Sequence, residues 1–184
     1  MTSLDIGCGP QSKRADVGVD VIPGPAVDVV HDLNVIPWPF AECSFDHIYC
    51  FDTLEHLHDV IAALHEIHRI AKPGATIEIQ VPTGSSRDRY TDPTHLRGFG
   101  YRSFDYFDPR TEFFRRYGYT GPMFHINSRT FSSPIYGHLG FADKATCWFA
   151  NHWPHLYERR LAYMFPADVL RFTLVAIKDQ APTP

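Results

Sequence analysis

A short apolar segment that runs directly into a glycine-rich turn constrains the fold of this chain more than any other feature. Residues 4–6 have the length of a buried strand, and Gly7, Cys8, Gly9 and Pro10 follow at once. Glycine lets the backbone turn sharply and approach a ligand without a Cβ atom in the way. At the carboxyl edge of an open parallel sheet, such a turn lies where ligands bind. The opening residues therefore predict an α/β fold with a ligand site after the first strand.

Further short apolar runs alternate with turns and crossovers up to Pro82. We predict further strands at residues 18–21, 27–30, 45–51 and 75–81. Strands repeated with crossovers of this kind indicate a mostly parallel sheet with helices packed on its faces.

One amphipathic helix is predicted between the last two of these strands. Apolar residues recur there at spacings of three and four from Leu54 to Ala71. Asp52 and Glu55 have the spacing of a capping box before it. Residues 72–74, Lys-Pro-Gly, predict its end.

The pattern weakens after Pro82. Residues 83–130 read as a long loop rich in glycine, aspartate and aromatics, and we expect it to act as a mobile lid. A strand at 144–150, a short helix at 155–165 and a final strand at 169–178 complete the prediction.

Length and composition favour a soluble protein with one globular domain. The chain has 184 residues, 44% of them hydrophobic, and no apolar run approaches the roughly 20 residues of a membrane helix. The net charge of −4 makes nucleic acid an unlikely partner. No leader pattern is seen at the start, and the four cysteines form no CxxC pair. We expect a cytoplasmic protein with free thiols.

Polar residues follow the second and third predicted strands. A carboxylate at Asp20 can accept hydrogen bonds from both hydroxyls of a ribose, and Asp32 can meet an adenine amino group while Leu33 packs against the ring. The nicotinamide fingerprint requires a third glycine where Ser12 stands and an acidic residue about 20 positions after the glycines, and Asp20 comes too early for that. The pattern thus favours a nucleoside other than a nicotinamide dinucleotide.

The successive segments LDIGCGP, GVDV, HDLN followed by PWPF, FDHIYCFDTLEHL and IAKPGATIEIQVP resemble the motifs of class I S-adenosylmethionine-dependent methyltransferases. The resemblance covers residues 4 to about 82. It implies a Rossmann-like, seven-stranded, mostly parallel sheet that ends in an antiparallel hairpin, assigned here to residues 144–150 and 169–178. It also implies a single domain, residues 1–184, with a cofactor-binding half at 4–82 and a substrate half at 83–184.

By this resemblance the cofactor is S-adenosyl-L-methionine. Its methionine part would lie along the glycine turn, and its ribose would bind at the end of the second strand. Its adenine would bind at the end of the third strand, and its sulfonium would lie at the end of the fourth. The implied cofactor residues are Asp5, Gly7, Cys8, Gly9, Asp20, Val21, Asp32, Leu33, Cys50, Phe51 and His56.

The first crossover is shorter than the family usually has. About seven residues separate Pro10 from Gly18, too few for a full helix. This truncation would leave the cofactor cleft less covered, so the loop after Pro82 or a second copy in a homodimer could supply the cover.

The segment from Asp92 to Arg97 resembles the D-P-x-H-x-R segment of many small methyltransferases and follows the fifth strand. We expect His95 to take a proton from an oxygen or nitrogen of a small-molecule acceptor, Asp92 to orient its imidazole, and Arg97 to hold an anionic group.

Two other functions remain open from the sequence. A non-catalytic protein that binds S-adenosylmethionine as a sensor or scaffold is the main alternative, and a nicotinamide-dependent dehydrogenase is a more distant one. No metal site is predicted, because His65 and His68, three residues apart, have no matching carboxylate or cysteine cluster.

Overall fold

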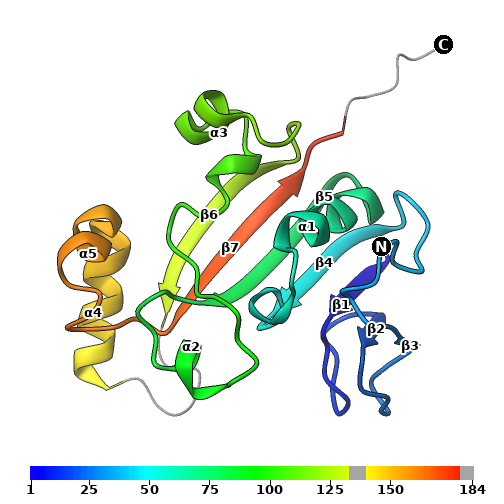
Figure 1. Cartoon of the computed structure of the whole chain (residues 1–184), viewed down its shortest axis with the longest axis horizontal. Coiled ribbons are helices and arrows are strands. Elements are labelled where there is room, and N and C mark those ends of the chain that lie inside the picture. Colours follow the sequence, from blue (N-terminus) through cyan, green and yellow to red (C-terminus); the bar gives the residue numbers. More distant parts are fainter. Residues whose placement is uncertain (133–139, 179–184) are drawn as a thin grey trace.

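A seven-stranded sheet forms the centre of the computed structural model, which describes residues 1–132 and 140–178. The strand order is β3-β2-β1-β4-β5-β7-β6, and Figure 1 shows β1 to β3 at one end of the sheet and β6 at the other. This arrangement confirms the predicted Rossmann-like α/β fold.

The first five strands are parallel to one another, as the sequence predicts. Their bounds are Ser3–Ile6 (β1), Val17–Asp20 (β2), Val29–Val30 (β3), Phe45–Phe51 (β4) and Ala71–Pro82 (β5). Residues 7–16, between β1 and β2, contain no helix, so the first crossover is truncated as expected.

The sheet ends in an antiparallel hairpin, but one of its two predicted strands was wrong. Val169–Ala176 (β7) pairs antiparallel with β5 on one side and with Phe124–Ser132 (β6) on the other. Residues 144–150 lie within helix α4, Phe141–His152. A short apolar run fits a strand or a helix equally well, and here the run packs one face of a helix against β6.

The predicted central helix is shorter than its apolar pattern. A 3₁₀ helix, Leu54–His56 (η1), comes first, and the α-helix α1 spans Val60–Ile70. Asp59 caps α1 by accepting a hydrogen bond from the amide of Ala62. The capping box predicted at Asp52 and Glu55 was therefore wrong, because the chain turns away at Asp52, whose φ is 51°. β5 then begins directly at Ala71.

The prediction of a loop over residues 83–130 was also wrong in part. The segment contains Asp88–Thr91 (α2), Asp105–Phe107 (η2), Glu112–Tyr117 (α3) and the first part of β6. The helix predicted at 155–165 is Pro154–Arg160 (α5). Figure 1 shows α4 and α5 side by side at the β6 end of the sheet.

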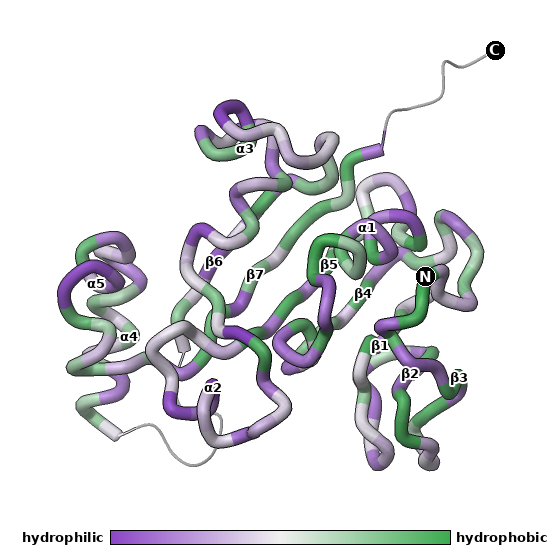
Figure 2. Tube along the Cα trace, in the orientation of Figure 1, coloured by the Kyte–Doolittle hydropathy of each residue, from purple (hydrophilic) through white to green (hydrophobic). Residues whose placement is uncertain are grey.

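Aliphatic and aromatic side chains from the sheet fill the core. Leu4, Ile48, Ile77 and Leu174 come from neighbouring strands and are fully buried. Figure 2 shows hydrophobic residues along the strands and hydrophilic residues in α2. None of the helices in the described ranges combines the length and the apolar character that crossing a membrane requires.

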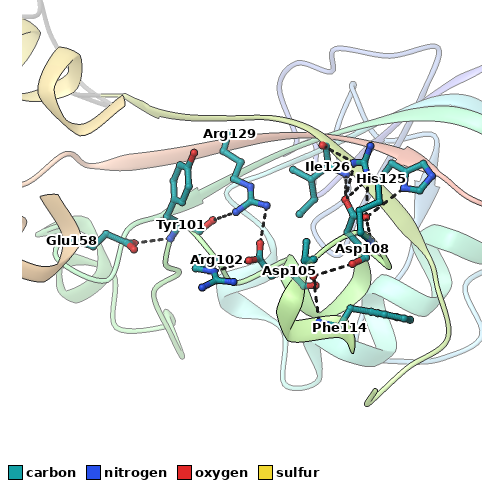
Figure 3. A network of polar contacts seen from close by, with 11 residues as sticks. Tyr101, Arg102, Asp105, Asp108, Phe114, His125, Ile126, Arg129 and Glu158 are labelled. Atoms are coloured by element: carbon teal, nitrogen blue, oxygen red, sulfur yellow. Dashed lines mark hydrogen bonds and ion pairs between the residues drawn. The ribbon is translucent and has the colours of Figure 1, made fainter. Parts of the chain in front are cut away.

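Two buried carboxylates fasten residues 101–117 to the hairpin, as Figure 3 shows. Asp105 forms ion pairs with Arg102 and Arg129 at 2.7 and 2.8 Å. Asp108 pairs with Arg110 at 2.7 Å and accepts the amide hydrogen of Ile126 in β6. These contacts hold residues 101–117, which lie within the segment predicted to be a lid, against the antiparallel end of the sheet.

Candidate functional site

The glycine turn after β1 is packed tightly against the end of β4. A Cβ atom on Gly7, whose φ is +67°, would lie 2.2 Å from Oγ1 of Thr53. The Thr53 hydroxyl lies 3.1 Å from the carbonyl oxygen of Ile6 and 2.9 Å from that of Phe51. Only glycine fits this position, so the turn brings the ends of β1 and β4 together.

Asp20, the last residue of β2, shapes the turn from the other side. One of its carboxylate oxygens accepts the amide hydrogen of Gly9 and the other accepts that of Ile22, both at 2.8 Å. A carboxylate has about four acceptor positions, so two remain for hydroxyl groups of a ligand. Asp20 therefore holds the turn and still presents acceptors outward.

A cavity of about 440 Å³ opens beside this turn, and we call it the glycine-turn cavity. Its volume lies within the range of small-molecule sites. It is lined by Gly7, Asp20, Val21, Ile22, Asp32, Leu33, Asn34, Asp52, Thr53, His56, Leu57 and Thr94.

The glycine-turn cavity has the surface that a nucleoside requires. Asp32 accepts two hydrogen bonds from Asn34 on one carboxylate oxygen, which leaves the other oxygen to meet a donor on a ligand. Leu33 and Leu57 are buried and provide an apolar wall for a flat ring. The residues present thus fit both the polar ribose and the apolar face of adenine.

Five of the residues predicted for the cofactor do not line the glycine-turn cavity. Asp5 is fully buried and accepts the amide hydrogen of Arg14 at 2.8 Å. The Cys8 thiol faces the carbonyl of Ala26, and Cys50 is fully buried. Their positions shape the turn and the strands behind it.

Gly9 and Phe51 also lie outside the cavity linings. The Gly9 amide donates its hydrogen to the carboxylate of Asp20. The ring of Phe51 faces the guanidinium of Arg14, 4.7 Å from the ring centre, and that of Arg171. Asp52 and Thr53, the two residues after β4, line the cavity at the end of this strand.

A second cavity, of about 460 Å³, adjoins the first, and we call it the histidine cavity. It is lined by Asp52, Glu55, His56, Pro82, Asp88, Thr91, Asp92, Pro93 and His95. Asp52 and His56 line both cavities. The two spaces are therefore neighbours that share a wall.

Asp52 is held in this shared wall by side chains from two other strands. Its carboxylate accepts a hydrogen bond from Nε2 of Gln80 at 2.8 Å, and Oε1 of Gln80 in turn accepts one from Arg171 at 2.8 Å. The φ of 51° is unusual for a residue other than glycine. Burial raises the pKa of the Asp52 carboxyl, against the hydrogen bond from Gln80 that lowers it.

Glu55 is the most deeply buried acidic group of the histidine cavity, with 1% of its surface exposed. Burial raises its pKa to about 8, and the neighbouring charges of Asp52 and Asp92 add to the rise. Oε2 of Glu55 has no hydrogen-bond partner among the described residues.

Two histidines face Glu55. The rings of His56 and His95 lie with their centres 4.6 Å apart at an angle of 69°. Nδ1 of His95 is buried and has no hydrogen-bond partner in the described part of the chain. Burial, followed by the charge of His95, lowers the pKa of His56.

The structure corrects the roles expected of Asp92 and Arg97. Asp92 accepts hydrogen bonds from the amide and hydroxyl of Thr94, and Thr94 contacts Nδ1 of His56 at 2.8 Å. Asp92 thus orients His56 through Thr94. The backbone carbonyl of Asp92 accepts the amide hydrogen of His95 at 3.2 Å, but among the described contacts its carboxylate forms no bond to the His95 imidazole. Arg97 donates to the carbonyl of His58 and does not line the histidine cavity.

Several residues of this site were missed from the sequence. Asn34, Thr53, Leu57 and Thr94 line the glycine-turn cavity, and Asp88 and Thr91 line the histidine cavity. Asp52 and Glu55 were assigned to a helix cap, although their position directly after a parallel strand is itself typical of a ligand site.

A family model described as a methyltransferase domain matches residues 1–131. No curated protein sequence matches the chain significantly.

Solved structures share the fold at low sequence identity. A SAM-dependent methyltransferase from Archaeoglobus fulgidus has 16% identity and a TM-score of 0.59, with 94% of this chain and 85% of that chain covered. The N-methyltransferase NodS from Bradyrhizobium japonicum, in complex with S-adenosyl-L-homocysteine, has 12% identity and a TM-score of 0.53, with coverage of 96% and 78%. A methyltransferase from Haloferax volcanii, solved with its Trm112 activator, has 16% identity and a TM-score of 0.56, with coverage of 96% and 83%.

The family match covers more than half of the chain and agrees with the order of the strands and with the motifs in the sequence. The chain therefore belongs to the methyltransferase domain family and is a class I methyltransferase, an enzyme whose methyl donor is S-adenosyl-L-methionine.

Proposed function

We propose that the enzyme transfers the methyl group to an oxygen or nitrogen atom of a small-molecule acceptor held in the histidine cavity. The observation that carries this proposal is the wall of Asp52 and His56 that the glycine-turn and histidine cavities share. A donor in the first cavity and an acceptor in the second would meet at that wall. Holding two reactants in line is the main task of a methyltransferase, since positioning alone supplies a large part of the rate.

The cofactor residues follow from the lining of the glycine-turn cavity. Asp20 would accept hydrogen bonds from the ribose hydroxyls, and Asp32 and Leu33 would hold the adenine. The methionine part would run along the turn at Gly7, which directs the sulfonium toward Asp52 and His56.

The transfer itself is a single displacement. The acceptor's lone pair forms a bond to the methyl carbon while the carbon–sulfur bond breaks, and its electron pair returns to sulfur to give a neutral thioether. The acceptor's proton is lost, and an imidazole facing the cavity, that of His95, can receive it.

The charge of the histidine cavity narrows the acceptor class. Four carboxyl groups line it, those of Asp52, Glu55, Asp88 and Asp92, and Arg97 lies outside it. Glu55, with a pKa of about 8, is mostly uncharged at neutral pH. The other carboxylates still make the cavity unfavourable for an anionic acceptor. We therefore propose a neutral or cationic acceptor that carries hydroxyl or amino groups, in place of the anionic acceptor that Arg97 suggested from the sequence.

Incubation with methyl-labelled S-adenosylmethionine and fractionated small-molecule extract tests this proposal. Label should pass to a neutral or basic low-molecular-weight fraction, and a heat-denatured sample gives the background. Transfer only to protein or nucleic acid would contradict the small-molecule proposal, and transfer only to acidic metabolites would contradict the acceptor class.

A homodimer that covers the cofactor cleft remains a proposal. Val21 and Ile22 at the edge of the glycine-turn cavity are 59% and 57% exposed, which is unusual for two neighbouring apolar side chains. Sedimentation with and without the cofactor should show a dimer that forms or tightens when the cleft is filled. A monomer under both conditions would contradict it.

A further inference from the structure

Three side chains with metal-binding atoms meet in the histidine cavity. Glu55, His56 and His95 each offer one ligand atom, and these atoms all lie within 4.8 Å of one another. Ligands of a tetrahedral ion with bonds of about 2.1 Å stand about 3.4 Å apart. Small rotations of the three side chains would therefore close them around one ion.

In two of these side chains, one buried polar atom has no hydrogen-bond partner among the residues that the structure describes. Oε2 of Glu55 and Nδ1 of His95 form no hydrogen bond within the described ranges, although Glu55 is only 1% exposed. Buried polar atoms are normally bonded, so two unpartnered atoms in one cluster of metal-binding side chains indicate a group that binds there. Asp52 contributes a third orphaned atom, Oδ1, on the wall of the same cavity.

The third side chain, His56, is oriented as a metal ligand would be. The Thr94 hydroxyl has one hydrogen, which it donates to the Asp92 carboxylate at 2.7 Å. Thr94 therefore accepts the hydrogen of Nδ1 of His56, to which it lies at 2.8 Å. This leaves Nε2 of His56 with a free lone pair, and a fixed carboxylate–hydroxyl–histidine chain of this kind supports many metal-binding histidines.

We propose that Glu55, His56 and His95 bind a divalent transition-metal ion, with Asp52 as a further oxygen donor. Two imidazoles and a carboxylate suit ions such as Zn²⁺ and Co²⁺, whereas Mg²⁺ and Ca²⁺ prefer sites made of oxygen alone. Three protein ligands leave coordination positions open toward the cavity, which is typical of a catalytic site.

The role of this site rests on the proposed function. An ion at the wall between the two cavities would supply Lewis acid chemistry to an acceptor hydroxyl, lowering its pKa and fixing its position beside the donor. His95 would then act as a ligand, and the acceptor's proton would pass to water.

Titration of the metal-free protein with Co²⁺ alone, followed by visible absorption and calorimetry, tests the proposal. One equivalent should bind and give absorption bands that report nitrogen and oxygen ligands, and Zn²⁺ should displace it. His56→Gln and His95→Gln should each weaken the affinity by at least about tenfold. His58→Gln is the matched control, since His58 is exposed and lies two residues from His56; it should leave the affinity unchanged.

The outcomes separate this proposal from the proposed function. Stoichiometric binding that both ligand variants weaken supports the site, even if no acceptor is ever methylated. Absence of saturable Co²⁺ binding, or equal affinity in His56→Gln, His95→Gln and His58→Gln, would overturn it. Circular dichroism and thermal unfolding of each metal-free variant confirm that a weakened metal affinity does not come from unfolding.

Discussion

At the scale of single residues, Asp20 combines two tasks. It fixes the glycine turn through the amides of Gly9 and Ile22, and its remaining acceptor positions face the glycine-turn cavity. The same carboxylate thus holds the turn and lines the cavity, so we expect its removal to weaken binding of the cofactor.

We predict that Asp20→Ala weakens S-adenosylmethionine binding by about 2 kcal/mol, or about thirtyfold in Kd, because charge-assisted hydrogen bonds to the ribose are lost. Isothermal titration calorimetry measures this. Asp16→Ala is the control: Asp16 lies just before the opposite end of β2 and contacts Ser3. Equal affinities of the two variants would show that Asp20 does not bind the cofactor.

Gly7 and Gly9 share a left-handed backbone but differ in their surroundings. A Cβ on Gly7 would strike Thr53, whereas one on Gly9 would meet no atom within 4 Å. Gly9→Ala should cost about 1–2 kcal/mol for the backbone conformation alone. Gly7→Ala should cost a further 1–3 kcal/mol or so for overpacking.

Chemical denaturation of the two variants measures the difference in the free energy of unfolding. The same amino-acid change at two positive-φ positions serves as an internal control. If Gly9→Ala proved as unstable as Gly7→Ala, the contact with Thr53 would not be what requires glycine at Gly7.

At the scale of elements, the parallel strands β1 to β5 could be predicted from the sequence, whereas the edge strand β6 could not. β1 to β5 follow local signals, namely apolar runs closed by glycine, proline or aspartate. β6 is an edge strand with several exposed polar residues and a register shift between Ile126 and Ser128, so it lacks a clear alternation. β6 forms because it pairs with β7, from which more than 35 residues separate it in the sequence. No local sequence pattern shows such a contact.

The capping box fails for a related reason. Asp52 and Glu55 have the right spacing for a capping box, but Asp52 adopts a left-handed backbone directly after β4. The spacing of Asp52 and Glu55 predicted a helix cap, whereas in the structure the two side chains line the histidine cavity. The histidine cavity could not be predicted because it joins residues 52–56 to residues 88–95 across the whole of β5.

The Asp108 network makes the stability of this end of the sheet depend on pH. Burial alone would raise the pKa of Asp108, but hydrogen bonds from Arg110, Ile126 and His125 hold it well below its usual range. A carboxylate with a lowered pKa stabilises the fold fully above the pKa of the unfolded chain, about 3.9, and loses this contribution as the pH falls below it.

We predict that Asp108→Asn lowers the free energy of unfolding by about 3 kcal/mol at neutral pH, because Arg110 loses its buried partner. Thermal unfolding from pH 7 to pH 2 should show the gap between wild type and variant narrowing below about pH 4. A gap that stays constant, or widens, in acid would show that the charge of Asp108 is not what stabilises the hairpin.

At the scale of the whole molecule, the segment after β5 links the site to the rest of the fold. Thr83 and Phe99 form an isolated bridge, and the amide of Leu96 donates to the carbonyl of Glu55. Thr94 at the same time lines the glycine-turn cavity. A ligand there would touch the parallel sheet and this segment together.

We predict that hydrogen exchange at residues 90–97 is faster than in β7 and slows when S-adenosylmethionine binds, because the ligand adds contacts at Thr94. Mass spectrometry of exchanged peptides measures this, with the α4 peptides as a reference that the ligand should leave unchanged. Equal exchange at residues 90–97 with and without the ligand would contradict a link between this segment and the cofactor.

The central claim is that S-adenosylmethionine binds in the glycine-turn cavity between the ends of β1, β2, β3 and β4. The most direct measurement is the change in backbone amide chemical shifts when the ligand is added to isotope-labelled protein. We predict the largest shifts at Gly7, Val21, Ile22, Leu33 and Asn34, with none at α4 or α5. Shifts confined to another part of the sheet, or none at saturating ligand, would contradict it.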